Sequence, residues 1–345
     1  MLYTYQNAKQ FGAANRQWQG IPGIERTRNG RLFVCFYSGG TGEQLGNYCA
    51  LLQSDDGGRT WADPVAAACA GEAARAYDPC LWIDPQGRLW FFWAVMPDHA
   101  VCAAVCGDPD AEILAWSEVK HIGADVMMNK PTVLQNGDWL LPVAVWREGV
   151  YVLPDCISPG KERLSFVCRS RDEGETFERI GGADVPDRRF DEHMLVEKND
   201  GALWMLVRTN YGIGQAFSYD SGAAWTPGGD SGLGGPCSRF FIRRLHSGHL
   251  LLINHANFTG RDNLTALLSR DDGATWEGGL LLDGRADVSY PDAVQAEDGT
   301  IYAVYDRERY GAKEILMARF TEADVLAGGI ASEAGALGMV VSKVG

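Results

Sequence analysis

Six short segments of the sequence share one pattern, in which a turn glycine is followed at once by a run of aromatic and aliphatic residues. They read NGRLFVCFY, QGRLWFFWA, NGDWLLPVAVW, DGALWMLVR, SGHLLLINH and DGTIYAVYD, with glycines at 30, 87, 137, 201, 248 and 299. A polar residue and a glycine between apolar runs are typical of a tight β-hairpin. The glycines recur at intervals of 57, 50, 64, 47 and 51 residues, about the length of a four-stranded propeller blade with its loops. The spacing predicts an all-β fold, a six-bladed β-propeller of four-stranded antiparallel blades.

A second pattern, Ser-x-Asp-x-Gly-x-Thr-Trp, occurs four times. The copies are SDDGGRTW at 54–61, SRDEGETF at 170–177, SYDSGAAW at 218–225 and SRDDGATW at 269–276. These residues suit a β-turn in which Asp accepts hydrogen bonds from backbone amides, Gly takes a positive φ and the aromatic ring packs under the blade. Each copy follows its hairpin glycine by 17 to 33 residues, so we expect it to close a later hairpin of the same blade. The second and sixth blades lack a clear copy.

We interpret residues 23–320 as one propeller and the whole chain, 1–345, as a single domain. Residues 1–15 are expected to supply an outer strand that closes the ring. Thr321 begins a pattern typical of a short capped helix, and residues 329–345 are expected to add a final strand or a tail.

Composition narrows the classes of partner. The net charge of −14 argues against nucleic acid and against an anionic membrane surface. No apolar run approaches the roughly 18 residues of a membrane span, and the first twenty residues lack the basic and apolar parts of a signal peptide. A cytoplasmic location is therefore expected, although a secreted chain trimmed of its leader would look the same. The nine cysteines are expected to be reduced and buried, and the Cys102–Cys106 pair lacks the further ligands of a metal site.

The hairpin repeat also identifies equivalent positions in the six blades, because residues at one offset from each glycine should take equivalent places in the ring. Nine residues before each glycine, or eight before Gly137, the sequence has Ile21, Asp78, Asn129, Glu192, Arg239 and Tyr290. Isolated charges at a buried strand start are costly unless they are paired or solvated. We favour a functional site at the mouth of the ring; the alternative is a hydrated channel whose polar groups satisfy one another.

Residues beside these positions complete the candidate set. Arg208 lies at the end of the hairpin FDEHMLVEKNDGALWMLVRT that carries Glu192, and Arg261 opens the segment RDNLTALLS. His193 either contacts a ligand or packs. Asn129 with Lys130, and Asp306 with Arg307, either rim a pocket or pair with each other. Glu43, in the glycine-rich stretch YSGGTGEQLGNY, is interpreted as part of a plain connecting loop.

The four Ser-x-Asp-x-Gly-x-Thr-Trp segments resemble the Asp-boxes, or BNR repeats, of sialidases (neuraminidases), and the order of motifs is similar across nearly the whole chain. The resemblance implies a tyrosine nucleophile at Tyr290, a glutamate base for it at Glu192 and an acid/base aspartate at Asp78. It also implies that Arg208 and Arg261 are two of three arginines that bind a substrate carboxylate.

The third arginine of that pattern is missing. Sialidases begin the first blade with Arg-Ile-Pro, whereas this chain has Gly20 before Ile21 and Pro22. The arginine often found just before the first Asp-box is absent as well. Arg16, Arg26 and Arg239 are candidates to replace the missing side chain, and Arg239 is preferred because its offset matches the ring of site residues.

The resemblance implies an exo-acting, retaining sialidase that releases terminal sialic acid from glycans and needs neither cofactor nor metal. Two alternatives stay open. One is a glycosidase or lyase for another acidic sugar, such as a 2-keto-3-deoxy acid or a uronic acid, which the glycine at position 20 suggests. The other is a non-catalytic glycan-binding propeller, because Asp-boxes also occur in non-enzymes. The expected partner is a sialylated glycan or free sialoside, and neither linkage preference nor oligomeric state follows from the sequence.

Overall fold

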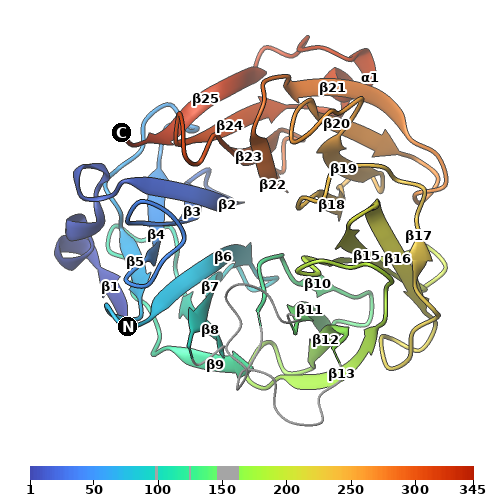
Figure 1. Cartoon of the computed structure of the whole chain (residues 1–345), viewed down its shortest axis with the longest axis horizontal. Helices are drawn as coiled ribbons and strands as arrows, with labels where there is room; N and C mark the ends of the chain where they lie inside the picture. Colours follow the sequence, from blue (N-terminus) through green and yellow to red (C-terminus); the bar gives the residue numbers. More distant parts are fainter. Residues whose placement is uncertain (98–99, 124–125, 146–162) are drawn as a thin grey trace.

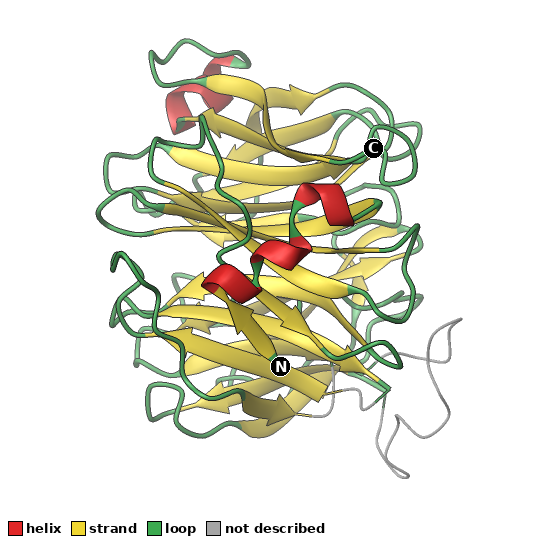
Figure 2. Cartoon of the chain, turned by 90° about the vertical axis from the view of Figure 1, so that its left-hand side faces the viewer, coloured by secondary structure: helices red, strands yellow, loops and turns green. Residues whose placement is uncertain are grey.

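The computed structural model describes residues 1–97, 100–123, 126–145 and 163–345. Six antiparallel sheets are arranged around a central axis (Figure 1). In the side view, strands fill the body of the molecule and the short helices lie on its surface (Figure 2). The six-bladed propeller predicted from the glycine repeat is confirmed.

Each blade runs from an inner strand at the axis to an outer strand at the rim. Blade one contains β2 (Trp18–Arg26), β3 (Leu32–Gly39), β4 (Tyr48–Ser54) and β5 (Ala66–Cys69). Blade two contains β6 (Arg75–Ile83), β7 (Leu89–Met96), β8 (Ala100–Cys106) and β9 (Lys120–Gly123). Blade three contains β10 (Thr132–Val133), β11 (Trp139–Ala144), β12 (Ser165–Ser170) and β13 (Glu178–Ala183). Blade four contains β14 (Met194–Glu197), β15 (Leu203–Thr209), β16 (Gly212–Ser218) and β17 (Gly229–Asp230). Blade five contains β18 (Phe241–Arg244), β19 (Leu250–His255), β20 (Leu264–Ser269) and β21 (Glu277–Asp283). Blade six contains β22 (Val288–Gln295), β23 (Ile301–Arg307), β24 (Glu314–Phe320) and β25 (Ala336–Lys343).

The N-terminal segment begins at the outer edge of blade one and reaches the last strand of the ring. Strand β1 (Leu2–Thr4) pairs with β5 as a fifth, outermost strand of blade one, and the 3₁₀ turns η1 (Tyr5–Asn7), η2 (Lys9–Phe11) and η3 (Ala13–Asn15) follow it. Arg16 Nη2 then donates to Ser342 Oγ of β25 at 2.7 Å. Helix α1 (Glu322–Ala327) begins after the Thr321 cap, and β25 is the outer strand of blade six. The expected outer strand, capped helix and final strand are therefore all present.

The two turn motifs occupy fixed places in the blades. The six hairpin glycines join first strand to second, with φ between 82° and 101°. The four Asp-boxes lie between third and fourth strands, where the aspartate binds backbone and hydroxyl groups of its own turn. Asp271 Oδ1, for example, accepts from Thr275 N at 2.8 Å and from Ser269 Oγ at 2.8 Å. The Thr275 hydroxyl also donates to Asp271 Oδ2, and this bond, followed by those from Thr275 N and Ser269 Oγ, lowers the pKa of Asp271 to about 2. The box aromatics pack against the blade cores, as predicted.

Apolar side chains from adjacent blades interdigitate to form the core. Between blades two and three, for example, Trp82 meets Trp139 edge to face, with ring centroids 4.7 Å apart. Such pairs contribute about 0.5–1.5 kcal/mol beyond the burial of their area. The packed faces hold the blades at fixed angles and so fix the directions of the inner strands.

Four buried charged residues lie near the axis, and we call Glu25, Lys130, Arg239 and Asp292 the hub. Lys130 Nζ donates to Glu25 Oε1 at 2.8 Å and lies 3.1 Å from Asp292 Oδ2. It also donates to the backbone carbonyls of Ile24 and Leu81, while Arg239 Nη1 donates to the carbonyl of Pro22. Pairing of this kind offsets the cost of removing charges from water. The hub thus joins inner strands from opposite sides of the ring.

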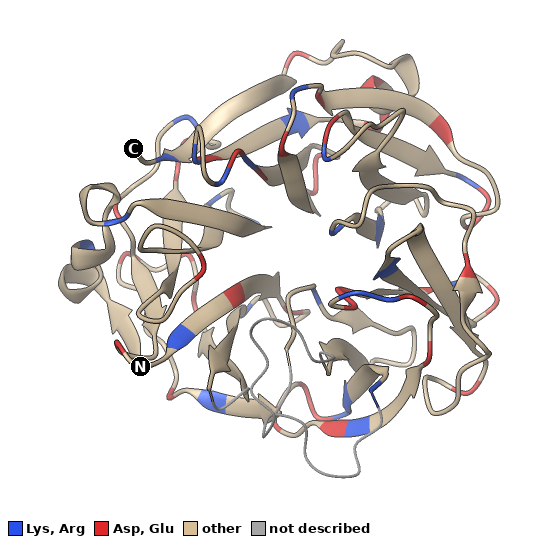
Figure 3. Cartoon of the chain, viewed as in Figure 1, with Lys and Arg blue, Asp and Glu red and all other residues tan. Residues whose placement is uncertain are grey.

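Acidic and basic residues lie close together on many strands and loops (Figure 3). The eight described cysteines are free thiols, and Cys156 lies outside the described residues. In the part of the chain that the structure describes, no helix is long and apolar enough to cross a membrane.

Candidate active site

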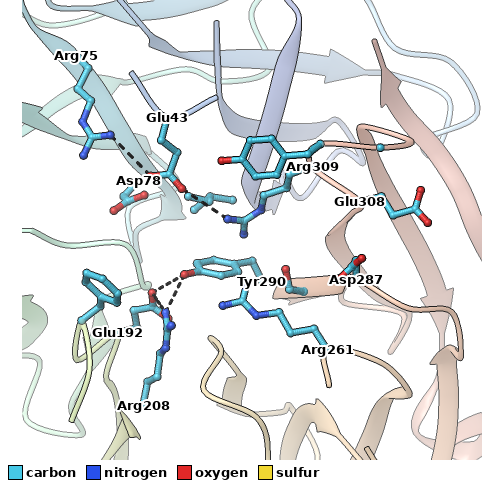
Figure 4. Close-up of a pocket in the computed structure, with 15 residues that line it drawn as sticks. Glu43, Arg75, Asp78, Glu192, Arg208, Arg261, Asp287, Tyr290, Glu308 and Arg309 are labelled. Carbon is cyan, nitrogen blue, oxygen red and sulfur yellow. Dashed lines mark hydrogen bonds and ion pairs between the residues drawn. The ribbon is translucent and has the colours of Figure 1, made fainter. Parts of the chain in front are cut away.

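A pocket of about 690 Å³ opens at the end of the ring where the inner strands begin (Figure 4). Blades one, two, four, five and six contribute to it. Its wall carries four arginines and five acids: Arg75, Arg208, Arg261, Arg309, Glu43, Asp78, Glu192, Asp287 and Glu308. Of the predicted site residues, Asp78, Glu192, Tyr290, Arg208 and Arg261 line this pocket.

An unusual backbone conformation turns four of the wall residues into the pocket. Ile21, Asp78, Glu192 and Tyr290 all have positive φ, between 43° and 58°. Where the inner strand continues past such a residue, as at Asp78, its pairing with the second strand shifts register. Left-handed conformations cost non-glycine residues about 1–3 kcal/mol each and persist where the surrounding structure enforces them. Each kink redirects one side chain from the sheet toward the ring mouth.

Tyr290, Glu192 and Arg208 form one hydrogen-bonded cluster in the pocket lining (Figure 4). The Tyr290 hydroxyl donates to Glu192 Oε1 at 2.6 Å, and Arg208 Nη1 donates to the same oxygen at 2.5 Å. Arg208 Nη1 also lies 2.9 Å from the Tyr290 oxygen. The hairpin from β14 to β15 supplies both Glu192 and Arg208, and β22 supplies the phenol.

Burial, together with the negative charge of Glu192, raises the pKa of Tyr290, while Arg208, Arg309 and Arg261 act against that rise. The phenol therefore keeps its proton in the free protein. That proton lies in the short bond to Glu192, from which it can pass to the carboxylate when the phenol oxygen attacks an electrophile.

Cys237 links the two predicted carboxylate-binding arginines. Arg208 Nε donates to Cys237 Sγ at 3.4 Å, and Arg261 Nη2 donates to the Cys237 carbonyl at 3.2 Å. The Arg261 guanidinium lies 5.5 Å from the centre of the Tyr290 ring. Both cations thus face the same phenol from blades four and five.

Asp78 lies apart from this cluster, on the kinked part of β6, and is almost fully buried. Burial, followed by the charge of Glu43 and opposed by Arg75, raises the pKa of Asp78 to about 8. At neutral pH this carboxyl group therefore holds a proton that it can donate, which is the property of a general acid.

Arg309 is a wall residue that the sequence analysis missed. Its guanidinium lies 4.2 Å from the centre of the Tyr290 ring, and Asp306 holds it through contacts of 2.8 Å to Nε and 2.7 Å to Nη2. The side chain passes directly over Gly20, where an added Cβ would lie 2.7 Å from Arg309 Nε. An arginine of the β23–β24 loop thus occupies the space left open by the glycine at position 20.

The structure places the other predicted substrate-binding residues outside the pocket lining. Arg239 and Lys130 belong to the hub, so Arg239 is not in the position expected of a replacement arginine. Asn129 Nδ2 donates to the carbonyls of Glu192 and His193 and thereby supports the segment that carries Glu192. The His193 ring bonds to the Phe166 carbonyl at 2.7 Å, and burial lowers the pKa of His193 to about 4. Neither Asn129 nor Arg239 has the left-handed backbone of the wall residues.

Two further candidates for the missing arginine also lie elsewhere. Arg16 is bound to the Phe11 carbonyl and to Ser342, and Arg26 lines a separate cavity of about 230 Å³. Among the described residues, no group of three or more His, Cys, Asp and Glu side chains is arranged to hold a metal ion.

The family profile of the BNR repeat-like domain matches residues 30–303. The chain belongs to this family. No curated protein matches this BNR-family chain at the sequence level. Its fold is similar to that of the Hadza microbial sialidase Hz136, with a TM-score of 0.73 and 18% identity over 94% of this chain and 69% of that one.

Two further solved structures have a similar fold. The intramolecular trans-sialidase from Ruminococcus gnavus gives a TM-score of 0.70 at 14% identity, over 92% of this chain and 97% of that one. The NanB sialidase from Streptococcus pneumoniae gives 0.67 at 11% identity, over 94% and 71%. At these identities the similarity establishes the shared fold, and the chemistry has to be argued from the pocket itself.

Proposed function

We propose that this protein is a retaining exo-sialidase. The observation that carries the proposal is the Tyr290–Glu192–Arg208 cluster, in which a phenol, a carboxylate and a guanidinium meet within hydrogen-bonding distance in the pocket lining. A tyrosine with a carboxylate base suits attack on an anomeric carbon that itself bears a carboxylate. The uncharged phenol is not repelled by that group, whereas an Asp or Glu nucleophile would be.

In the first step, Asp78 donates its proton to the glycosidic oxygen as the bond from that oxygen to the anomeric carbon breaks. The Tyr290 oxygen attacks the anomeric carbon, and the phenol proton passes to Glu192. The products are the neutral leaving group and a sugar covalently bound to Tyr290. This step requires Asp78 to be protonated beforehand, which its pKa of about 8 favours at neutral pH.

In the second step, the Asp78 carboxylate takes a proton from water, and the oxygen of that water attacks the anomeric carbon. The bond to Tyr290 breaks, and Glu192 returns the proton to the phenolate. Two displacements at one carbon retain its configuration, and both enzyme groups recover their starting protonation.

The substrate carboxylate is held by guanidinium groups around Tyr290. Arg208, Arg261 and Arg309 all approach this ring, from blades four, five and six. Planar guanidinium groups bind carboxylates through paired, charge-assisted hydrogen bonds. We therefore assign the third arm of the carboxylate site to Arg309 in place of the expected Arg239.

The test is release of methylumbelliferone from its sialoside by the purified protein, with Tyr290→Phe as the variant. The parent should turn the substrate over, and the variant, which keeps the ring but lacks the attacking oxygen, should lose nearly all activity. Tyr302→Phe is a matched control, because it removes a phenol oxygen from a residue outside the pocket lining. Absence of turnover by the parent, or an unchanged rate in Tyr290→Phe, would refute the proposal.

A second candidate is a glycosidase or lyase for another acidic sugar. It is favoured by the carboxylates of Glu43, Asp287 and Glu308 on the wall and by the relocated arginine, both of which alter the contacts offered to an acidic sugar. A panel of acidic glycosides at equal concentration separates the two candidates, since this one predicts that a non-sialic substrate has the highest kcat/KM. Binding to sialylated glycans without any product would instead support a non-catalytic, glycan-binding propeller.

A further inference from the structure

Glu43 reaches the pocket from a loop that is shaped by glycine and asparagine. The loop joins β3 to β4, and Gly39 and Gly46 both have positive φ. A Cβ on Gly40 would lie 2.4 Å from the Gln44 amide nitrogen. Asn47 closes the loop, because its Oδ1 accepts from Gly40 N at 2.9 Å and its Nδ2 donates to the Gly42 carbonyl at 2.7 Å. The plain connecting loop expected from the sequence is instead a defined support for one carboxylate.

The Glu43 carboxylate lies between two guanidinium groups of the pocket (Figure 4). Its Oε2 is 3.7 Å from Arg75 Nη1, and its Oε1 is 4.0 Å from Arg309 Nη1. These separations exceed hydrogen-bonding distance, so the interaction is an ion pair to each side. Because only 27% of the Glu43 side chain is exposed, solvent screens these charges less than at an open surface.

The charges that face Asp78 come from four elements. They are Glu43 from the β3–β4 loop, Arg75 from β6, Glu192 from the segment before β14 and Arg309 from the β23–β24 loop; the thiol of Cys49 on β4 is also near. Glu192 is already paired with Arg208. Arg75 and Arg309 would therefore stabilise Asp78 as a carboxylate if Glu43 did not offset them.

We propose that Glu43 is a positioning residue that keeps Asp78 in its proton-donating form by pairing with Arg75 and Arg309 from the solvent side. The inference rests on the proposed function, because the role of a proton donor is assigned to Asp78 there. Glu43 itself transfers no proton and forms no bond to the sugar. It acts through the two arginines and through its own charge.

The direct test measures the protonation of Asp78 without any substrate. Aspartate carboxyl carbons are isotope-labelled and titrated by NMR, and Asp78→Asn identifies the resonance. Glu43→Gln should lower the pKa of Asp78 by on the order of one unit, because a like charge is removed while two cations remain. Glu43→Asp keeps the charge and should retain a pKa nearer that of the parent. Glu72→Gln removes an exposed acid near the same loop, since the backbone oxygen of Glu72 lies 4.0 Å from the Cβ position of Gly46. This control should leave the pKa of Asp78 unchanged.

The kinetic test uses two leaving groups. With sialyllactose, whose sugar leaving group needs a proton, the alkaline limb of kcat/KM in Glu43→Gln should move to lower pH by the same amount as the titration. The phenolic leaving group of the methylumbelliferyl sialoside needs less protonation. With this substrate, Glu43→Gln should therefore lose less activity near pH 8 than it loses with sialyllactose. An equal loss on both substrates, with no shift of the limb, would assign Glu43 to sugar binding and overturn the inference.

The two proposals fail differently. A parent protein that hydrolyses no sialoside refutes the proposed function, whereas the NMR titration still decides whether Glu43 controls the proton on Asp78. An Asp78 pKa that is the same in the parent and in Glu43→Gln, with both proteins folded by circular dichroism, refutes the inference whatever the substrate.

Discussion

Replacement of Gly20 by alanine tests whether Arg309 has taken over a substrate-binding position. A methyl group at this site would lie 2.7 Å from Arg309 Nε and 2.8 Å from Cδ. Ordinary contacts begin at 3.4 Å, so the guanidinium would have to move by about 0.7 Å. Asp306 resists that movement through its two contacts with Arg309, and Asp306 is itself held by Ile21 N and Ser289 Oγ at 2.7 Å each. The added methyl group is therefore expected to change the orientation of the Arg309 guanidinium.

The size of the effect follows from the bonds that Arg309 is assigned. A hydrogen bond to a charged group contributes about 1.5–3 kcal/mol, and each 1.36 kcal/mol corresponds to about tenfold in binding or rate. A shift of this size should weaken rather than abolish the bonds, which predicts a fall in kcat/KM of about 10-fold for Gly20→Ala. Arg309→Ala removes the bonds altogether and should cost about 10- to 100-fold, with much of the loss in KM.

The assay combines hydrolysis of the methylumbelliferyl sialoside with calorimetric binding of the unsaturated sialic acid analogue. Gly107→Ala is the matched control, because no atom lies within 4 Å of a Cβ at that glycine. The double variant Gly20→Arg, Arg309→Gly moves the guanidinium to the other strand and should recover part of the affinity that Arg309→Gly loses. Parent-like binding by Arg309→Ala would refute the reasoning, as would a Gly20→Ala variant indistinguishable from Gly107→Ala.

Three further predictions concern the cluster, the acid and the turns. Glu192→Gln should lower kcat by about 10²- to 10⁴-fold, measured on the same sialoside, because the phenol loses its base. The pKa of Asp78 is raised from 3.8 to about 8 in the folded state, so the contribution of its protonated form to stability is present below pH 4 and is lost as the pH rises toward 8. Urea titrations between these pH values should therefore show a smaller loss of stability in Asp78→Asn than in the parent. Asp271→Asn should lower the Tm, because an amide is a poorer acceptor for Thr275 N, and a scan equal to the parent's would contradict the capping role.

The fold could be predicted because both turn motifs repeat with a regular period. A glycine with positive φ marks each first hairpin, and each Asp-box marks a later one, so the ring follows from counting. The offset from the hairpin glycines also identified Asp78, Glu192 and Tyr290. It did not separate them from Arg239, at the same offset, or from Asn129, one residue closer to its glycine, neither of which has the left-handed backbone. Whether a strand start kinks depends on its packing against neighbouring blades, which one sequence does not reveal.

The spacing of the hairpin repeat could not identify Arg309 and Glu43, for a different reason. Both lie in connecting loops, where no fixed offset relates sequence position to place in the ring. The glycine at position 20 was visible as a missing side chain, and the structure adds that an arginine some 290 residues later in the chain fills its space. Such an exchange between blades one and six depends on closure of the ring, which brings the first and last inner strands together.

The position of the hub bears on how molecules enter and leave the pocket. None of its four residues lines the pocket, while Lys130 and Glu25 line separate cavities of about 360 and 230 Å³. Because the ion pairs of the hub join residues on opposite sides of the ring, we infer that the pocket does not continue through the axis into these cavities. Under the proposed mechanism, the departing alcohol and the incoming water would then use the same opening in turn, and clearance of the alcohol would limit the access of water. Any other alcohol that enters the vacated space would then compete with water for the sugar that the proposed mechanism places on Tyr290.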